Sequence, residues 1–177
     1  MSETPIVKIY KADASIPTPK YQTHGAACFD LHAYMPVGEK IKVFTKDAEP
    51  RLLEPSWDSQ RNLPYMTLFP GERALLRTGL IFDIPSDYSI RMYARSSMAW
   101  KYGLVVAQGE GVIDEDFTDE THIIIANISV SSAKIYGTER IAQAELVRYE
   151  QCEFQELSDL PPRKGNRVGG LGSTGRT

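Results

Sequence analysis

Apolar and polar residues alternate in short runs along most of this chain, which is the pattern of β-strands. Glycine, proline and small polar residues separate the runs. We expect strands over residues 6–10, 39–44, 74–84 (interrupted at Gly79), 88–94, 122–128 and 141–149. The run at 122–128 is apolar enough to be buried on both faces. Short strands between turns predict an all-β sandwich or barrel.

One short helix interrupts this pattern. Ser96 or Ser97 could cap it, residues 98–102 would form about one turn, and Gly103 would end it.

Two further segments break the alternation. Residues 45–65 hold three prolines, mixed charges and Trp57, and we interpret them as a long surface insertion, an extra loop or small hairpin. From residue 158 onward, two prolines and repeated glycines predict a flexible C-terminal arm. We therefore expect a β domain over residues 1–157 and an arm over residues 158–177.

Composition narrows the class of protein. With 177 residues, 42% of them hydrophobic and 24% charged, the chain fits one soluble globular domain. A net charge of −3 gives no indication of nucleic-acid binding, and no apolar run is long enough to span a membrane. The N-terminus lacks signal-peptide features, and two cysteines make neither a metal pattern nor a disulfide framework. An intracellular, cytoplasmic setting is the simplest expectation, in a host cell if the source is viral.

The segment 111–117 carries the most informative chemistry. If it is extended, Asp114 and Asp116 project from the same face, at the end of a hairpin. A carboxylate held there could accept a proton from water or hold the water shell of a metal. Alone, two acids near a turn are more often a solvated loop.

Four other segments carry reactive or ligand-binding groups, and each also has an ordinary explanation. Asp30 lies in an apolar strand, where a turn contact would account for it. Arg95 offers a planar donor fork beside two serines at a helix start, an arrangement common in N-caps. Gln143 enters a strand, as many surface glutamines do. The glycines and hydroxyls of 167–176 suit phosphate oxygens but also suit a disordered tail.

These five segments, in this order, resemble the five motifs of the trimeric deoxyuridine triphosphate nucleotidohydrolases (dUTPases). The resemblance spans roughly residues 25–175, and five motifs in order are highly specific although each alone is not. It implies a distorted β jelly roll of the β-clip type, a homotrimer with shared active sites, and an arm that closes over the nucleotide. It also implies hydrolysis of dUTP to dUMP and pyrophosphate with Mg²⁺, which limits uracil in DNA and supplies dUMP for dTMP synthesis.

The resemblance assigns roles to individual residues. Asp114 would be the base that activates water for in-line attack on the α-phosphorus, and Asp30 would contact Mg²⁺ through water in its outer shell. The implied nucleotide-binding residues are Arg95, Ser96, Ser97 and Gln143 at the phosphates; Gln108, Gly111, Val112 and Ile113 in a hairpin around uracil; Phe117 at the deoxyribose; and Arg167, Gly170, Leu171, Gly172, Ser173 and Thr174 in the arm. Phe117 stands where the family usually has tyrosine, and Leu171 where it has a stacking phenylalanine.

Three other readings stay open. A dCTP deaminase shares the fold and an Arg-Ser-Ser segment, but the residues that follow Asp114 favour the diphosphatase. A nucleotide-sensing protein would use the same pocket and the 45–65 insertion to bind a protein partner that is unknown. A structural jelly roll would bind no nucleotide.

Overall fold

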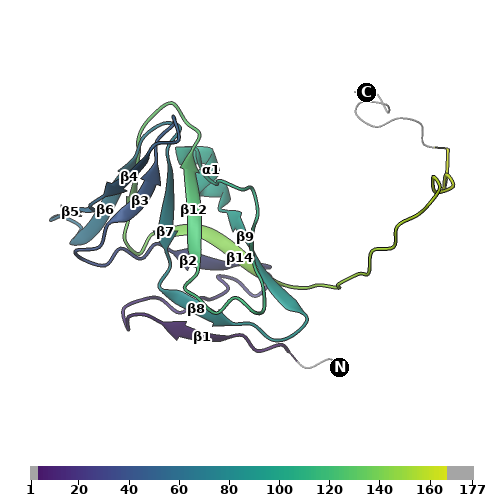
Figure 1. The fold of residues 1–177 in the computed structure, drawn as a ribbon. Coiled ribbons are helices and arrows are strands. Elements are labelled where there is room, and N and C mark those ends of the chain that lie inside the picture. Colours follow the sequence, from purple (N-terminus) through teal and green to yellow (C-terminus); the bar gives the residue numbers. More distant parts are fainter. Residues whose placement is uncertain (1–3, 167–177) are drawn as a thin grey trace.

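The structure is a computed structural model that describes residues 4–166. These residues form strands and one short helix, as the alternation predicts (Figure 1). The elements, in chain order, are β1 Lys8–Lys11, β2 Phe29–His32, β3 Ile41–Phe44, β4 Pro50–Leu53, β5 Ser56–Asp58, β6 Leu63–Leu68, β7 Arg73–Arg77, β8 Leu80–Asp83, β9 Tyr88–Ala94, α1 Ser96–Tyr102, β10 Leu104–Val106, β11 Gly111–Ile113, β12 His122–Asn127, β13 Ala133–Tyr136 and β14 Arg140–Arg148.

Two larger sheets and two small ones enclose the core. The strand orders are β10-β12-β7-β3-β4 and β11-β9-β14-β2 in the larger sheets, and β13-β6-β5 and β1-β8 in the smaller ones. Every pairing is antiparallel. Inward-facing side chains such as Leu76, Ile90, Ile123 and Ile141 are almost completely buried in one core. An antiparallel sandwich of this kind buries one face of each sheet.

Strand β12 is less buried than its sequence suggests. Ile123 and Ile125 are buried, whereas Ile124 on the opposite face is only partly buried. The prediction of burial on both faces is therefore wrong for the isolated chain, because β12 lies in an antiparallel sheet with a single packed face.

Glycine separates β7 from β8 where the sequence predicts an interruption. Gly79 has φ +68°, a left-handed conformation that costs glycine little. A Cβ at this position would collide with the side chains of Ile16 and Tyr34. Its lack of a side chain therefore lets the chain turn close to the core.

Helix α1 begins two residues earlier than expected. Its N-cap is Arg95, which makes no side-chain capping hydrogen bond, so neither Ser96 nor Ser97 is the cap. Gly103 ends the helix as predicted, with φ 62° and its N–H donated to the carbonyl of Ala99. Within residues 4–166, no helix is long and apolar enough to cross a membrane.

The 45–65 segment is part of the sheets and is more ordered than a surface loop. Strand β4 pairs with β3 at the edge of a larger sheet, and β5 forms a hairpin with β6. Arg51 on β4 donates to both carboxylate oxygens of buried Glu72, at 2.9 and 2.8 Å from Nη2. Glu72 also accepts the Phe69 N–H at 2.9 Å. This bidentate ion pair holds the 45–65 insertion against the turn before β7.

Replacing Arg51 with glutamine is expected to lower the free energy of unfolding by about 1–3 kcal/mol, since buried Glu72 loses its charged partner. Chemical denaturation followed by circular dichroism measures the change. Lys46→Gln is the matched control, because the Lys46–Asp47 pair is exposed and should contribute almost nothing. Equal stability of the two variants would contradict the anchoring role of Arg51.

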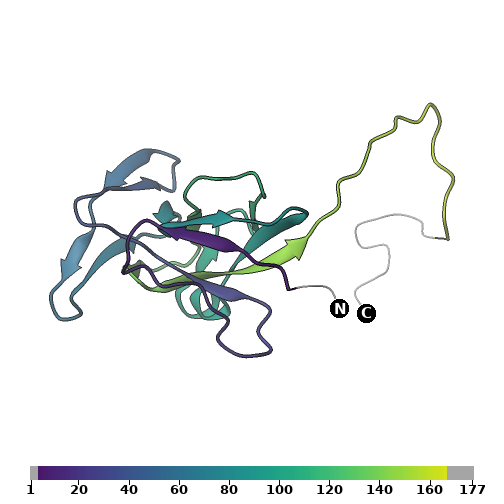
Figure 2. The same cartoon turned by 90° about the horizontal axis from the view of Figure 1, so that it is seen from below.

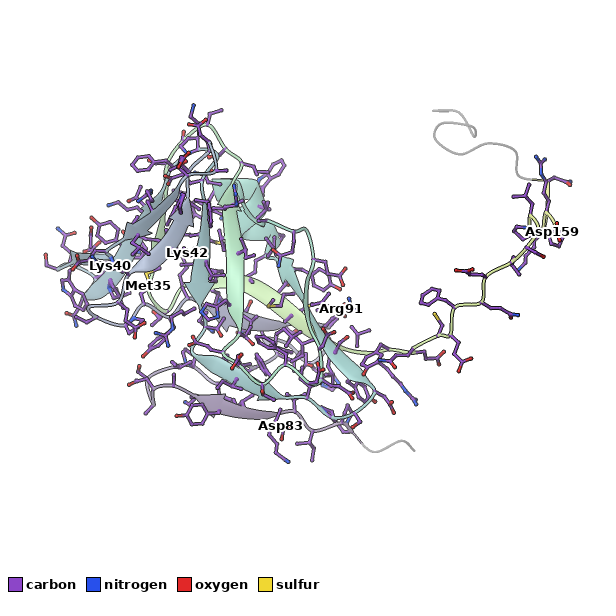
Figure 3. The ribbon with its side chains drawn as sticks, in the orientation of Figure 1. Met35, Lys40, Lys42, Asp83, Arg91 and Asp159 are labelled. Carbon is purple, nitrogen blue, oxygen red and sulfur yellow. The ribbon has the colours of Figure 1, made fainter. Side chains whose placement is uncertain are left out.

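The described chain ends in an extended segment outside the body. Residues 150–166 are exposed and carry no regular secondary structure. Figures 1 and 2 both show this segment leaving the end of β14 and running away from the sheets. In Figure 3 the labelled Asp159 lies well apart from the packed domain.

Candidate functional site

Two arginines hold one buried aspartate at the end of strand β9. Asp30 lies on β2, which pairs with β14, and is only 7% exposed. Its Oδ1 lies 2.8 Å from Arg95 Nε, and its Oδ2 accepts a hydrogen bond of 3.1 Å from Arg140 Nη1. Burying a carboxylate costs free energy unless charged donors pair with it, as the two guanidinium groups do here. The arrangement fixes both guanidinium groups beside the start of α1.

Gln143 joins the same cluster through the sheet. It lies opposite Asp30 on β2 and opposite Tyr93 on β9. Its Nε2 donates to the carbonyl of Ala94 at 3.1 Å, and Arg95 Nη1 donates to the carbonyl of Arg140 at the same distance. The structure therefore brings together the candidate segments that contain Asp30, Arg95 and Gln143.

The serines that follow Arg95 open onto solvent. Ser96 is exposed and Ser97 partly exposed, in the first turn of α1. The first N–H groups of a helix lack intrahelical acceptors. Together with two arginines, these donors can bind an anion such as phosphate.

Sequence reasoning missed Arg140. Its position at the start of β14 suggests an ordinary surface cation, and only the pairing of β14 with β2 places it on Asp30. The signal available in the sequence was its place three residues before Gln143, in a segment already of interest.

His32 also lies beside this cluster, two residues after Asp30 and therefore on the same strand face. Burial lowers the pKa of His32, although the Asp30 carboxylate acts in the opposite direction. The ring is therefore neutral at pH 7 and does not compete with the arginines for Asp30.

The Asp114 segment forms a turn. Strand β11 ends at Ile113, and the Phe117 N–H donates to the Asp114 carbonyl at 3.2 Å. Asp114 and Asp116 thus do not alternate along a strand, and the prediction that they project from one strand face is wrong. Both carboxylates are exposed, and the Phe117 ring is 41% exposed. The turn presents acidic and aromatic groups to solvent.

Residues 106–113 form a connection between sheets, which corrects the predicted hairpin. Strand β10 pairs with β12 and β11 pairs with β9, so the two strands belong to different sheets. Gly109, with φ 80°, donates its N–H to the Val106 carbonyl at 2.9 Å and turns the chain.

Side chains pack closely around Gly111 in this connection. A Cβ on buried Gly111 would collide with Met92 and lie 3.3 Å from Gln108 Nε2. Val112 is exposed and Ile113 is buried. The Gln108 amide therefore lies close to Gly111, within the segment predicted to contact uracil.

The two halves of the candidate site lie at opposite ends of β9. Ile113, just before Asp114, pairs with Ile90, whereas Arg95 directly follows the other end of the strand. Five residues of extended chain separate Ile90 from Arg95, or about 16 Å. One chain therefore does not bring Asp114 and the Asp30–Arg95 cluster to the same reacting atom.

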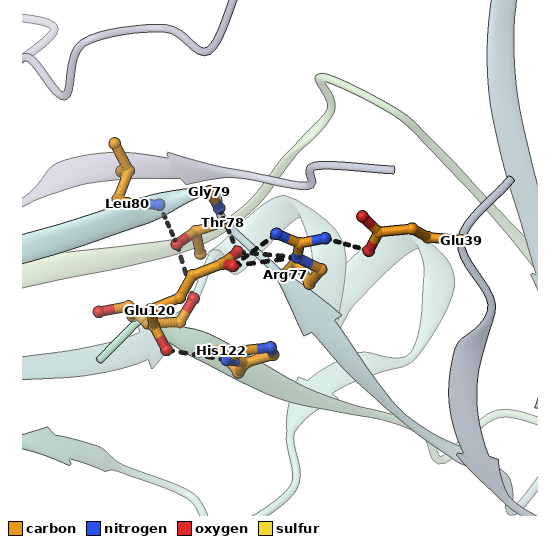
Figure 4. Close-up of polar contacts among 8 residues, drawn as sticks. Glu39, Arg77, Thr78, Gly79, Leu80, Glu120 and His122 are labelled. Atoms are coloured by element: carbon orange, nitrogen blue, oxygen red, sulfur yellow. Dashed lines mark hydrogen bonds and ion pairs between the residues drawn. The ribbon is translucent and has the colours of Figure 1, made fainter. Parts of the chain in front are cut away.

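A hydrogen-bond network centred on Glu120 holds the segment that follows the turn at residues 114–117 (Figure 4). The Glu120 carboxylate accepts hydrogen bonds from Arg77 Nη2 and the Gly79 N–H, both at 2.7 Å. Arg77 also pairs with Glu39. Burial acts to raise the pKa of Glu120, but the donors from Arg77 and Gly79 outweigh it and lower the pKa. No local sequence pattern indicates this pair, because 43 residues separate its members.

Because its pKa is lowered in the folded state, Glu120 stabilises the fold above the ordinary value of 4.5, and the contribution disappears as pH falls through the folded pKa. Glu120→Gln should therefore lower the free energy of unfolding at pH 7 by about 1–3 kcal/mol. The gap to wild type should shrink as pH falls below 4.5 and through the lowered pKa of Glu120. Urea denaturation across this range measures it. The control Glu39→Gln removes the more exposed partner and should cost less, and a pH-independent gap for Glu120→Gln would contradict the ionic role.

The arm residues Arg167, Gly170, Leu171, Gly172, Ser173 and Thr174 lie outside the described residues.

Comparisons with known proteins point to one family. The dUTPase family model matches residues 62–175. Two bacterial proteins named deoxyuridine 5'-triphosphate nucleotidohydrolase are each 33% identical to this chain. The Nautilia profundicola protein aligns over 96% of this chain and 99% of its own, and the Roseobacter denitrificans protein over 93% and 90%.

Solved structures show the same fold at low sequence identity. The dUTPase of Staphylococcus bacteriophage 80alpha, solved with dUPNHPP, has a TM-score of 0.72 at 19% identity, covering 97% of this chain and 99% of that one. A mutant dUTPase of phage phi11 of S. aureus, described with a structural Mg(II) ion, has a TM-score of 0.64 at 16% identity, covering 87% and 97%. The expected all-β, jelly-roll-like fold with one short helix is confirmed.

Proposed function

Because the chain belongs to the dUTPase family, we propose that it hydrolyses dUTP to dUMP and pyrophosphate by attack of water on the α-phosphorus. The observation that carries the proposal is the Asp30–Arg95–Gln143 cluster. It brings together residues of three family motifs carried by the neighbouring strands β2, β9 and β14. Relatives named as nucleotidohydrolases also favour this reaction over deamination of dCTP. The reaction would limit uracil in DNA and supply dUMP, in an intracellular setting.

Asp114 is the proposed base. It is solvent-exposed in a turn, so a water molecule can reach it. The carboxylate would accept a proton from water as the oxygen attacks phosphorus. The Glu120–Arg77 pair supports this role by fixing the segment that follows the turn.

Arg95, Ser96, Ser97 and Gln143 are the proposed phosphate-binding residues, and we add Arg140. The two guanidinium groups are held by Asp30 before any ligand arrives, so little reorganisation is needed on binding. Their charge would stabilise pyrophosphate as it leaves.

Residues 106–113 are proposed to bind uracil. Gln108 and the backbone of Gly111, Val112 and Ile113 offer hydrogen-bonding groups across the inter-sheet connection. The exposed ring of Phe117 would pack on deoxyribose and leave no room for a ribose 2′-hydroxyl. The arm residues, Arg167 to Thr174, are proposed to close over the bound nucleotide and exclude water.

The oxygen groups of the site fit a Mg²⁺ ion that binds together with the triphosphate and keeps most of its own water ligands. Within residues 4–166, no three His, Cys, Asp or Glu side chains cluster as a metal cage. Each Asp30 oxygen takes one arginine nitrogen and keeps a further lone pair, so Asp30 can still accept a hydrogen bond from metal-bound water. Mg²⁺ commonly keeps several waters and few protein ligands. The ion would neutralise charge on the triphosphate.

The separation of Asp114 from Arg95 along β9 favours an active site shared between chains. Since Asp114 and Arg95 lie at opposite ends of the strand, we propose a homotrimer in which Asp114 of one chain meets the Arg95 cluster of another.

Pyrophosphate release from dUTP, dTTP, dCTP and UTP with Mg²⁺ tests the function. We expect rapid release from dUTP alone, loss of release on chelation with EDTA, and recovery on adding Mg²⁺. Ammonia release from dCTP would instead establish a deaminase. Saturable dUTP binding without pyrophosphate release would overturn the catalytic proposal.

A further inference from the structure

The segment that leaves β14 has a three-residue repeat. Residues 153–160 read Glu-Phe-Gln-Glu-Leu-Ser-Asp-Leu, so an acid and then an apolar residue recur at every third position. All of these side chains are exposed, with Phe154 at 95% and Leu160 at 96%. Large apolar groups in such numbers are uncommon on a free surface and suggest a binding partner.

A period of three matches one backbone conformation. The polyproline II helix has three residues per turn, so the acids would line one edge and the apolar side chains the next. The segment has no regular secondary structure and leads directly into Pro161 and Pro162, which favour this conformation. It is suited to bind a groove that combines aromatic and positively charged side chains.

Such a groove lies between the end of α1 and β13, and we call it the α1–β13 groove. It has a volume of about 610 Å³, and its lining includes Trp100, Tyr136, Arg61, Lys101 and Lys134. Trp100 is 90% exposed although it lies on a helix that buries only Met98. The groove therefore offers an uncovered indole beside several cations.

The cations of the α1–β13 groove have no carboxylate partners. Among residues 4–166, Arg61, Lys101 and Lys134 take part in no ion pair. Arg61 lies 4.4 Å from the Tyr136 ring centre, and Lys134 lies 4.5 Å from that of Tyr65. The acid in the lining, Glu139, accepts the Tyr136 N–H instead. An acidic ligand would therefore complement this surface.

We propose that residues 153–160 of one chain dock into the α1–β13 groove of a second copy of the same chain. Phe154, Leu157 and Leu160 would cover Trp100, and Glu153, Glu156 and Asp159 would face the unpaired cations. This contact would order residues 153–160 against a neighbouring chain. It rests on the assembly of chains proposed above, but it needs no nucleotide.

The path of the chain favours a second copy over the groove of the same chain. The last residue of β14, Arg148, pairs with Tyr88, whereas α1 follows the opposite end of β9. The segment leaves the body at the end remote from α1 (Figure 1). It would have to reverse direction to reach its own groove.

Disulfide trapping tests the contact. In a Cys28→Ser, Cys152→Ser background, Leu157→Cys is combined with Ser132→Cys in the groove lining, or with Val37→Cys as an exposed control outside it. After oxidation with diamide, a non-reducing gel should show covalent dimers and larger ladders for the groove pair only. Linkage within single chains, or a yield no higher than the control, would overturn the proposal.

Charge reversal provides the matched test. Replacing Glu153, Glu156 and Asp159 with lysine should lower the crosslink yield about tenfold, since like charges then face each other. Adding Lys101→Glu and Lys134→Glu should restore it, and failure to restore would contradict the charge pairing. dUTP turnover of the cysteine-free background is measured in parallel. Turnover without crosslinks overturns the docking alone, and crosslinks without turnover overturn the function alone.

Discussion

Replacing Asp114 with asparagine is expected to remove nearly all dUTP turnover while leaving dUTP binding close to that of wild type. The amide has the shape of the carboxylate but does not accept a proton from water at neutral pH. General-base catalysis contributes about 10²–10⁴-fold, and we expect kcat to fall within that range. Pyrophosphate release measures kcat, and isothermal titration with a non-hydrolysable analogue measures binding.

Asp116→Asn is the matched control for this experiment. Asp116 lies two residues away in the same turn and is equally solvent-exposed, so both substitutions remove one surface charge at little cost in stability. The control should retain most turnover. If Asp116→Asn were the inactive variant and Asp114→Asn the active one, the base would be misassigned. Weak binding by Asp114→Asn would show that its carboxylate positions the nucleotide.

Local features of this fold were predictable because they depend on neighbouring residues. Alternation located most of the strands, and Gly103 marked the end of α1 because few other residues adopt a left-handed conformation readily. The small hairpin expected as one form of the 45–65 insertion is present as β5 and β6, whereas the pairing of β4 with β3 was not predicted. The strands of the insertion are stabilised by distant contacts such as Arg51–Glu72, which no local pattern reveals.

The same distinction holds for the candidate site. Asp30, Arg95 and Gln143 were predicted from a family resemblance, and the structure places them together. Arg140 and Glu120 were missed because each acts through a partner distant in sequence, Asp30 and Arg77 respectively. The supposed hairpin at 106–113 was wrong since local turn chemistry does not reveal which sheet each flanking strand joins.

Mixing two inactive variants is expected to restore dUTP hydrolysis, and this is the sharpest test of a shared site. Asp114→Asn lacks the base, and Arg95→Ala lacks a phosphate ligand at the opposite end of β9. After denaturation and refolding of an equimolar mixture, some sites would combine Asp114 from one chain with Arg95 from another. If chains associate at random, about a quarter of the sites should be intact.

Each variant refolded alone should stay inactive. The control mixture pairs Asp114→Asn with a chain that carries both substitutions, and it should recover nothing because no chain then supplies an intact Asp114. Circular dichroism checks that Arg95→Ala keeps the fold, which we expect because Arg140 still neutralises Asp30. Absence of recovery in well-folded mixtures of confirmed hybrid composition would place both groups in one chain's site. Recovery near the expected fraction would show instead that Asp114 of one chain meets Arg95 of another. Association of chains would then overcome the separation of about 16 Å along β9 within each chain.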